Sequence, residues 1–301
     1  MALTEYDFIL KDRVQKIQSM TEYDFILKSY LSFSGGKDSC VVSRLLDMAI
    51  PGNKIPRVYF NTGIEYRAIL DHVKEMASTD DRIIIVNSGV NIPEMLKSVG
   101  YPFKSKEHSQ KVAIYQHSGL CKTVQNYIGN GSKDSFLCAE KLKYNFTPDF
   151  KLKVSDKCCK KLKKEIAQKW SEAQGKTITI TGIRKGEGGL RASMQGCAVF
   201  YDDNCRELKK FHPLFPCNDD FINEFIEREK IKLCKLYYPP YNFKRTGCKG
   251  CPYSLDLQKQ LDVMACYLPE ERRQCEYIWQ PIYTEYRRIG YRLENTLFDF
   301  S

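Results

Sequence analysis

The sequence predicts an α/β fold with a doubly wound, mostly parallel sheet and a helical C-terminal extension. Short apolar stretches such as SYLSF (29–33), RVYFN (57–61) and RIIIVNS (82–88) alternate with amphipathic stretches of helical length. This alternation is typical of parallel strands connected by crossover helices. A chain of 301 residues is also long enough to bury a large core of this kind.

The elements are predicted in chain order from hydrophobic periodicity, caps and turn residues. The octapeptide TEYDFILK occurs twice, at 4–11 and 21–28, and two copies are too few for a repeat architecture. We expect strands over 29–33, 57–61, 82–88 and 176–182, and helices over 4–19, 38–50, 65–77, 218–230 and from 269 onward.

Three details of these elements are specific enough to test. Phe8, Ile9 and Ile17 are expected to face inward from the first helix, and Asn218 to cap the helix after it. Pro281 is expected to kink or interrupt the last helix. Residues 100–150 are polar with few periodic signals, which predicts a mobile or inserted segment.

We expect three regions along the chain. They are an N-terminal helical segment over 1–28, a nucleotide-binding and metal-binding domain over 29–255, and a helical extension over 256–301.

Composition indicates where the protein is located and what kind of partner it binds. Hydrophobic residues make up 43% of the chain, which is typical of a globular protein, and no apolar run is long enough to span a membrane. The start lacks the layout of a signal peptide, so we expect a cytoplasmic protein without a membrane partner. The net charge of +10 favours an anionic partner, nucleotide or nucleic acid, although a merely basic surface would explain it too.

A phosphate site is predicted where the first strand ends. The string SGGKDS, comprising Ser34, Gly35, Gly36, Lys37, Asp38 and Ser39, lies between that strand and a helix. The two glycines allow the backbone to turn and approach a ligand, and the helix N-terminus favours an anion. The spacing is not that of a Walker A loop. A strand–helix turn without a ligand is the simpler alternative.

The loop resembles the pyrophosphate loop of the adenine nucleotide α-hydrolase family, which includes sulfonucleotide reductases and thiolation enzymes. Two further stretches agree with this resemblance. FNTGIEY (60–66) is similar to the family's second turn, with Asn61 in place of an acid, and GIRKGEGGLR (182–191) is similar to its arginine motif. The resemblance implies that Thr62, Gly63, Arg184 and Arg191 contact an adenine nucleotide.

Thirteen cysteines in a reducing compartment indicate metal binding rather than a disulfide framework. Cys248 and Cys251 form a Cys-x-x-Cys turn, and Cys158 and Cys159 form an adjacent pair at the start of a predicted helix. Four thiolates suit either a 4Fe–4S cluster or a structural zinc ion, although adjacent ligands are unusual for zinc.

The order of the two cysteine pairs resembles the cluster signature of iron–sulfur adenylylsulfate reductases. That resemblance implies a 4Fe–4S cluster on Cys158, Cys159, Cys248 and Cys251. Lysines are dense between 151 and 164, where Asp156 is the single acid. We expect them to offset the negative charge of the cluster site and to attract an anionic substrate.

One departure from the family leaves the reaction open. Sulfonucleotide reductases carry a nucleophilic cysteine in a Glu-Cys-Gly-x-His string near the C-terminus, whereas residues 276–301 contain no cysteine. Cys275, beside Arg272 and Arg273, is the best replacement by position, with Cys266 as the other candidate.

The sequence therefore keeps three functions open. The first is a reductase of adenylyl sulfate or phosphoadenylyl sulfate (PAPS) that takes electrons from a thioredoxin-like or thiol donor. The second is an ATP-dependent sulfurtransferase that thiolates DNA or tRNA; the aromatic residues after 276 would suit nucleic acid, but equally an ordinary packing helix. The third is a nucleotide-binding module without enzymatic activity. The cluster signature favours the reductase.

Overall fold

The computed structural model describes residues 4–129, 137–187, 191, 193–201 and 207–294, without the side chains of Glu22 and Tyr23. The chain forms two compact units. The first contains residues 1–61, 67–88 and 166–246, and the second contains 62–66, 89–165 and 247–301. The structure does not test the three predicted regions, whose boundaries stay a prediction.

The first unit is built on a six-stranded sheet with the order β3-β2-β1-β4-β6-β5. Every neighbouring pair is parallel except β5 and β6 at one edge, which are antiparallel. The mostly parallel sheet confirms the predicted fold class. The strands are β1 (Ser29–Ser32), β2 (Arg57–Asn61), β3 (Ile83–Asn87), β4 (Ile178–Ile180), β5 (Ala198–Phe200) and β6 (Leu208–Phe211).

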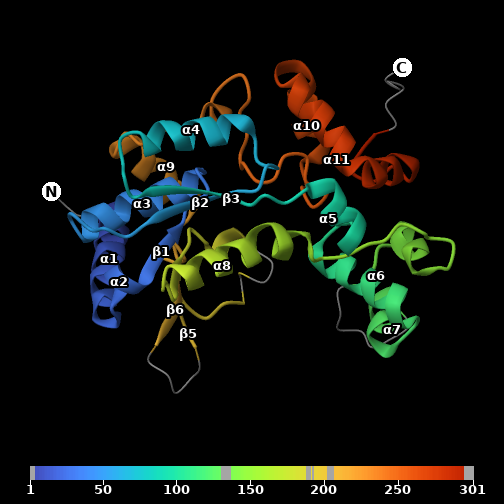
Figure 1. Cartoon of the computed structure of the whole chain (residues 1–301), viewed down its shortest axis with the longest axis horizontal. Coiled ribbons are helices and arrows are strands. Elements are labelled where there is room, and N and C mark those ends of the chain that lie inside the picture. Colours follow the sequence, from blue (N-terminus) through green and yellow to red (C-terminus); the bar gives the residue numbers. More distant parts are fainter. Residues whose placement is uncertain (1–3, 130–136, 188–190, 192, 202–206, 295–301) are drawn as a thin grey trace. The chain divides into compact units, whose positions relative to one another are not determined.

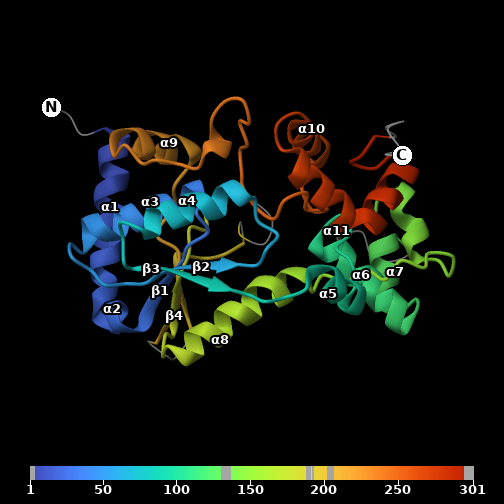
Figure 2. The ribbon, with the colours of Figure 1, turned by 45° about the horizontal axis from the view of Figure 1, so that its top comes forward.

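Helices cover both faces of this sheet, as Figure 2 shows for α3 and α4 on one side and α8 on the other. Trp170 of α8 packs edge-on against Tyr30 of β1, with ring centroids 5.2 Å apart. The apolar side of α3 is fully buried. The helices of this unit are α1 (Glu5–Ser19), α2 (Phe25–Lys28), α3 (Lys37–Ala49), α4 (Arg67–Ala77), α8 (Glu165–Ala173) and α9 (Asp219–Arg228), with the short turns η1 (Met20–Tyr23), η4 (Lys185–Glu187) and η6 (Lys235–Tyr237).

The caps explain where two of these helices begin. Thr4 and Asp7 form a reciprocal capping box at the start of α1. Asn218 accepts a hydrogen bond of 2.8 Å from the Phe221 amide and caps α9, as predicted. The inward-facing side of α1 was predicted less well, because Phe8 is 69% exposed whereas Ile17 is fully buried.

The second unit is helical, including the region predicted to be mobile or inserted. Residues 106–118 and 122–128 form α6 and α7. The segment is inserted between two parts of the first unit, which agrees with the second of the two alternatives predicted for it. Its helices gave few periodic signals because the buried side of α6 is partly polar: His108 and Ser109 are both fully buried beside Val112. The elements are α5 (Ile92–Val99), α6 (Lys106–Ser118), α7 (Lys122–Ile128), η2 (Glu140–Phe146), the π-helical turn η3 (Lys160–Lys164), α10 (Leu257–Tyr267) and α11 (Pro269–Arg288).

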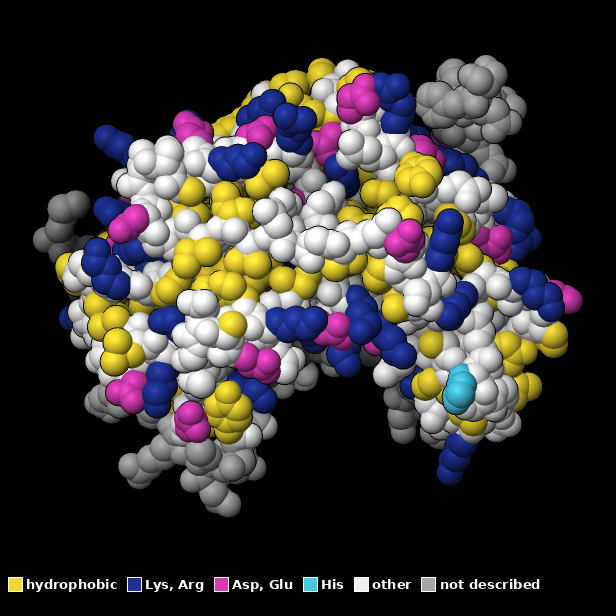
Figure 3. All heavy atoms as spheres, in the orientation of Figure 1, with side chains coloured by type: hydrophobic (Ala, Val, Ile, Leu, Met, Phe, Trp, Pro, Cys, Tyr) yellow, Lys and Arg dark blue, Asp and Glu magenta, His cyan; other side chains and the backbone are white. Residues whose placement is uncertain are grey.

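The C-terminal helices α10 and α11 form the predicted extension and are drawn in red tones in Figure 1. Helix α11 runs through Pro281 as one element, so the expected interruption does not occur. Within the described residues, no helix combines the length and the apolar character needed to cross a bilayer. On the face shown in Figure 3, Lys and Arg side chains are dispersed among Asp and Glu side chains.

Candidate functional site

The loop 34–39 lies at the point where the direction of strand progression reverses. From β1 the chain moves to β2 and β3 on one side, and later to β4 on the other side of β1. Ligands of open α/β sheets bind at the carboxyl ends of the strands at such a point. The predicted phosphate loop, which follows β1 and leads into α3, is therefore in the position expected of a nucleotide site.

The surroundings of this loop leave little room for side chains at its two glycines. Gly35 has a φ of +68°, and a Cβ atom there would lie 2.6 Å from a methyl group of Val73. A Cβ atom on Gly36 would lie 3.1 Å from the Tyr237 hydroxyl oxygen. The loop is thus held against α4 on one side and against Tyr237 on the other, and both glycines are buried.

Hydroxyl groups organise the inside of the loop. The Ser39 hydroxyl donates to the Gly36 carbonyl oxygen at 2.8 Å, and the Gly36 amide donates to the Ser34 hydroxyl at 3.3 Å. The Lys37 amide donates to the Tyr237 hydroxyl at 3.1 Å. Because Gly36 provides no side-chain cap for α3, the first turn of that helix is suited to an anionic ligand.

The arginine motif lies against the same helix. Gly182 is close to α3, since a Cβ atom there would lie 2.9 Å from Cβ of Asp38. Arg184 is 8% exposed and pairs with Asp219 at 2.8 Å. Its Nε atom forms an ion pair with Asp38 Oδ1 at 3.1 Å, although the two atoms do not meet the geometry of a hydrogen bond. The arginine motif is thus attached to the phosphate loop through Asp38.

Arg191, the second arginine of the motif, pairs with Glu187, and so does Arg245. Sequence reasoning did not select Glu187, although its place in the motif was a usable signal. It also missed Tyr237, whose hydroxyl bonds Lys37 and lies 2.7 Å from that of Thr246, because nothing in the local sequence marks a residue so far along the chain.

Thr62 and Gly63 belong to the second unit. Thr62 is 2% exposed, and its hydroxyl donates to the Glu65 carboxylate at 2.9 Å. Glu65 in turn forms an isolated antiparallel bridge with Cys248. These contacts attach the predicted nucleotide turn to the cysteine-bearing segment, and its contact with a nucleotide stays a prediction.

The four predicted metal ligands lie in the second unit and influence one another. Burial chiefly raises the pKa of the Cys158 thiol, and Cys159, Cys248 and Cys251 raise it further. Burial also raises the pKa of Cys251 to about 12, with a contribution from Cys248. The two cysteine pairs, far apart in the sequence, are thus brought close together. The chain is helical from Cys158 onward, as predicted.

The donor set fits an iron–sulfur cluster chemically, because the four cysteines lie near enough to raise one another's pKa, Cys158 being buried and the other three partly buried. Among the described residues, no three His, Cys, Asp or Glu side chains are arranged around one point as ligands of a single ion. A cubane cluster does not need that arrangement, since each of its four irons takes a different thiolate.

One lysine of the dense stretch reaches these thiols. Lys163 has a raised pKa, chiefly because of Cys248, and it lies 3.5 Å from the Glu65 carboxylate. Lys161 pairs with Glu165 instead. Lys151, Lys153 and Lys157 line a cavity. These lysines therefore differ in their surroundings, and not all of them offset the charge of the cysteine site as predicted.

Helix α11 holds the Cys-x-x-Cys turn in place. The indole of Trp279 donates to the Lys249 carbonyl oxygen at 3.1 Å, Tyr283 donates to the Gly250 carbonyl, and Tyr286 donates to the Pro252 carbonyl at 3.0 Å. These three residues share one side of the helix and are buried. The aromatic residues after 276 thus include a packing set, the simpler of the two predicted roles.

Cys275 lies under the same turn. It is fully buried, and a Cβ atom on Gly250 would lie 2.7 Å from its sulfur. Burial raises the pKa of its thiol to about 12. The neighbouring arginines do not reverse this effect, because Arg272 pairs with Glu276 and Arg273 pairs with Glu270. Burial therefore outweighs the neighbouring charges at Cys275, whereas Cys266 is exposed.

Residues 132–254 match the family model of the phosphoadenosine phosphosulfate reductase domain. The matched region contains the arginine motif and both cysteine pairs. The predicted resemblance to PAPS reductases is confirmed for this region, which is less than half of the chain.

Two uncharacterized proteins of Methanocaldococcus jannaschii are similar in sequence. One is 32% identical over 117 residues, which are 38% of this chain and 28% of the relative. The other is 24% identical over 222 residues, 74% of this chain and 35% of the relative. The chain thus spans about a third of these relatives' length.

Solved structures share the fold only distantly. A PAPS reductase from Candida auris has a TM-score of 0.46 and 14% identity, covering 82% of this chain and 97% of that one. The U34-tRNA thiolase of Methanococcus maripaludis, solved with a 4Fe–4S cluster, has a TM-score of 0.38 and 15% identity, covering 97% of this chain and 82% of that one. At this level of similarity neither structure bears on the reaction.

Proposed function

We propose that the chain is a sulfonucleotide reductase-like enzyme that binds an adenine nucleotide on the loop 34–39. The observation that carries this proposal is the position of a glycine-rich loop at the switch point of the sheet, with Arg184 of the arginine motif paired to Asp38 of the same loop. The substrate is adenylyl sulfate or PAPS, whose phosphate and sulfate groups suit this cationic, amide-rich place.

The four cysteines of the second unit are proposed to hold a 4Fe–4S cluster. Cys158, Cys159, Cys248 and Cys251 provide the thiolates, and Lys163 places a positive charge next to Cys248. When bound, the cluster would supply an inorganic core that can accept or donate an electron. The donor set is the same whether the substrate is a sulfonucleotide or ATP.

A second function, ATP-dependent sulfur transfer to DNA or tRNA, is favoured by the burial of Cys275. A reductase needs a thiolate that attacks the sulfur of the substrate and is later freed by a thioredoxin-like or other thiol donor. Cys275 is fully buried and has a raised pKa, so it is poorly suited to that attack as it stands. A transferase that releases AMP and pyrophosphate does not need this thiol.

Anaerobic turnover separates the two functions. The protein is incubated in parallel with adenylyl sulfate, PAPS and ATP, each with dithiothreitol, and ATP also with sulfide as the sulfur donor and with single-stranded DNA or tRNA as the acceptor. Sulfite release, with a cysteine adduct of about 80 Da for one sulfonate, supports the reductase. Formation of AMP and pyrophosphate from ATP only with an acceptor supports the transferase.

The nucleotide site itself is tested by binding. Lys37→Ala removes a positive charge from the loop, and Gly36→Val places side-chain atoms against Tyr237, so both are expected to weaken nucleotide affinity by at least about ten-fold. The exposed residue Lys54 in the same unit gives the matched control Lys54→Ala, which should bind normally. Wild-type affinity in both loop variants would contradict the site.

A further inference from the structure

The second unit contains a cavity of 740 Å³ formed by α6 and the chain segment that leads to Cys158. Fourteen residues line it, and none of them is acidic. Lys151, Lys153, Lys157 and His117 are among them. A concave site with this many cationic groups and no carboxylate is suited to an anionic ligand.

The lysines of the cavity are available to a ligand. All three are exposed, and Lys153 donates a hydrogen bond only to the Ser98 carbonyl oxygen among the described residues. Within the same residues, neither Lys151 nor Lys157 has an ion-pair partner. Other lysines of the stretch differ, because Lys161 and Lys163 are paired with carboxylates.

The segment that carries the lysines is fixed by hydrogen bonds to its backbone. Val154 forms a parallel bridge with Tyr101, and the side chain of Gln116 on α6 bonds the backbone of the segment twice. It accepts a hydrogen bond from the Val154 amide at 3.1 Å and donates one to the Leu152 carbonyl at 2.7 Å. The cationic row is therefore presented by an anchored backbone and not by a free loop.

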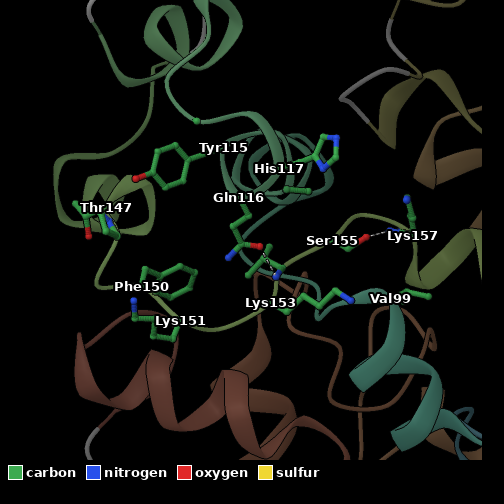
Figure 4. A pocket seen from close by; sticks show the side chains of 14 residues that line it. Val99, Tyr115, Gln116, His117, Thr147, Phe150, Lys151, Lys153, Ser155 and Lys157 are labelled. Atoms are coloured by element: carbon green, nitrogen blue, oxygen red, sulfur yellow. Dashed lines mark hydrogen bonds between the residues drawn. The ribbon is translucent and has the colours of Figure 1, made fainter.

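Two aromatic rings complete the cavity. Phe150 and Tyr115 both line it, as Figure 4 shows together with the lysines that follow one another from Lys151 through Lys153 to Lys157. Phe150 is held edge-on by Phe103, with ring centroids 5.9 Å apart. Rings beside a row of cationic groups are the combination by which proteins bind unpaired bases and their phosphates.

We propose that this cavity binds a single strand of nucleic acid. Phosphates lie along Lys151, Lys153 and Lys157, and an unpaired base lies against Phe150 and Tyr115. The lysines are two and four residues apart on a chain that extends by at most about 3.5 Å per residue, so they can meet neighbouring phosphates of one strand. A duplex would not present a base to these rings.

The proposal goes beyond the reductase and identifies the class of acceptor that the second candidate function needs. The row of lysines ends at Lys157, the residue before Cys158, so the strand would lead to the cysteine-bearing segment. The binding test below uses neither nucleotide nor turnover, so its failure would leave the proposed function of the loop 34–39 untouched.

The test is fluorescence anisotropy with the full, anaerobically purified chain and labelled DNA and RNA strands of about 12 nucleotides. The logarithm of the binding constant is plotted against the logarithm of the salt concentration. Three phosphate contacts in this cavity should contribute about −2 to the slope of that plot. The triple variant Lys151→Ala/Lys153→Ala/Lys157→Ala should lose about 2 units of slope. Phe150→Leu, which keeps an apolar side chain in place, should weaken binding about ten-fold at unchanged slope.

The control variant removes three exposed lysines of the same unit that do not line the cavity, Lys106→Ala/Lys122→Ala/Lys259→Ala, and should bind as the wild type does. Tighter binding of either DNA or RNA identifies the natural strand, and both results support the site. The proposal is overturned if both triple variants lose binding equally. It is also overturned if duplex binds as well as single strands, or if polyglutamate displaces the strand as efficiently as unlabelled oligonucleotide.

Discussion

At the scale of single residues, Gly35 shows how the nucleotide loop depends on backbone conformation. Its φ of +68° belongs to the left-handed region, and the methyl groups of Val73 and Ile69 occupy the space where a side chain would begin. A substitution should therefore lower the free energy of unfolding for two separable reasons, backbone strain and steric contact with α4.

Gly35→Ala is expected to lower the free energy of unfolding by about 1–2 kcal/mol for the left-handed backbone and by a further 1–3 kcal/mol or so for the contact with Val73. Gly52 gives a matched control, because its φ is +73° but nothing lies within 4 Å of its Cβ position. Gly52→Ala should show only the destabilisation that comes from the left-handed backbone. Urea unfolding of the two variants measures the difference, and equal destabilisation would contradict the described packing of the loop.

At the scale of elements, α11 stabilises the Cys-x-x-Cys turn by donating hydrogen bonds to its carbonyl groups. Tyr283 is fully buried and bonds the Gly250 carbonyl, while Tyr277 on the same helix is 74% exposed. The helix therefore has one side that positions the cysteine turn and another that faces solvent.

Tyr283→Phe keeps the ring but leaves the Gly250 carbonyl without this donor, which is expected to cost about 1–3 kcal/mol. The variant should also lose iron to a chelator faster than the wild type, because the turn that carries Cys248 and Cys251 is less firmly held. Tyr277→Phe should change stability by no more than about 0.5 kcal/mol. Identical stability and iron loss in the two variants would show that α11 does not position the turn.

The repeated octapeptide shows why some elements were predictable and others were not. Its first copy forms the start of α1, with Phe8 69% exposed. Its second copy spans a 3-10 turn and the short helix α2, with Phe25 fully buried. Identical local sequences thus differ in structure because of what they pack against, and local periodicity contains no such information.

At the scale of the whole molecule, stability should fall at acidic pH because three histidines, His72, His108 and His212, are buried and have a lowered pKa. Burial lowers the pKa of His108 to about 4 and that of His212 to about 4. Below the usual pKa of about 6.5 the unfolded chain binds protons that the folded chain does not. The stability that these residues provide is therefore complete above that pH and is lost as pH falls toward 4.

His108→Gln should remove part of this dependence, at most about 3 kcal/mol between pH 7 and pH 4. The neutral ring of His108 lies within hydrogen-bonding distance of Tyr127 and Asn145, at 3.0 and 3.1 Å, so the variant will also be less stable at neutral pH. His117→Gln, at an exposed position, is the control. Urea midpoints across this pH range measure the effect, and an unchanged slope in His108→Gln would contradict it.

The strand–helix alternation and the parallel sheet were predictable, because buried parallel strands are short apolar runs. The phosphate loop was equally predictable, because its glycine-rich sequence directly follows a predicted strand. The partners of the site were not, since Tyr237 and Arg245 reach it from distant parts of the chain. The burial of Cys275 was also hidden, because it results from the packing of α11 against Gly250 and not from its own neighbours in sequence.

The most direct test of the account is the metal and sulfide content of protein purified without oxygen. We expect brown protein with about four irons and four sulfides per chain. Cys158→Ser and Cys248→Ser should lose the iron, whereas Cys217→Ser, which removes a buried cysteine of the first unit, should retain it. Colourless protein with one zinc ion per chain, or full iron content in the first two variants, would contradict the proposed cluster.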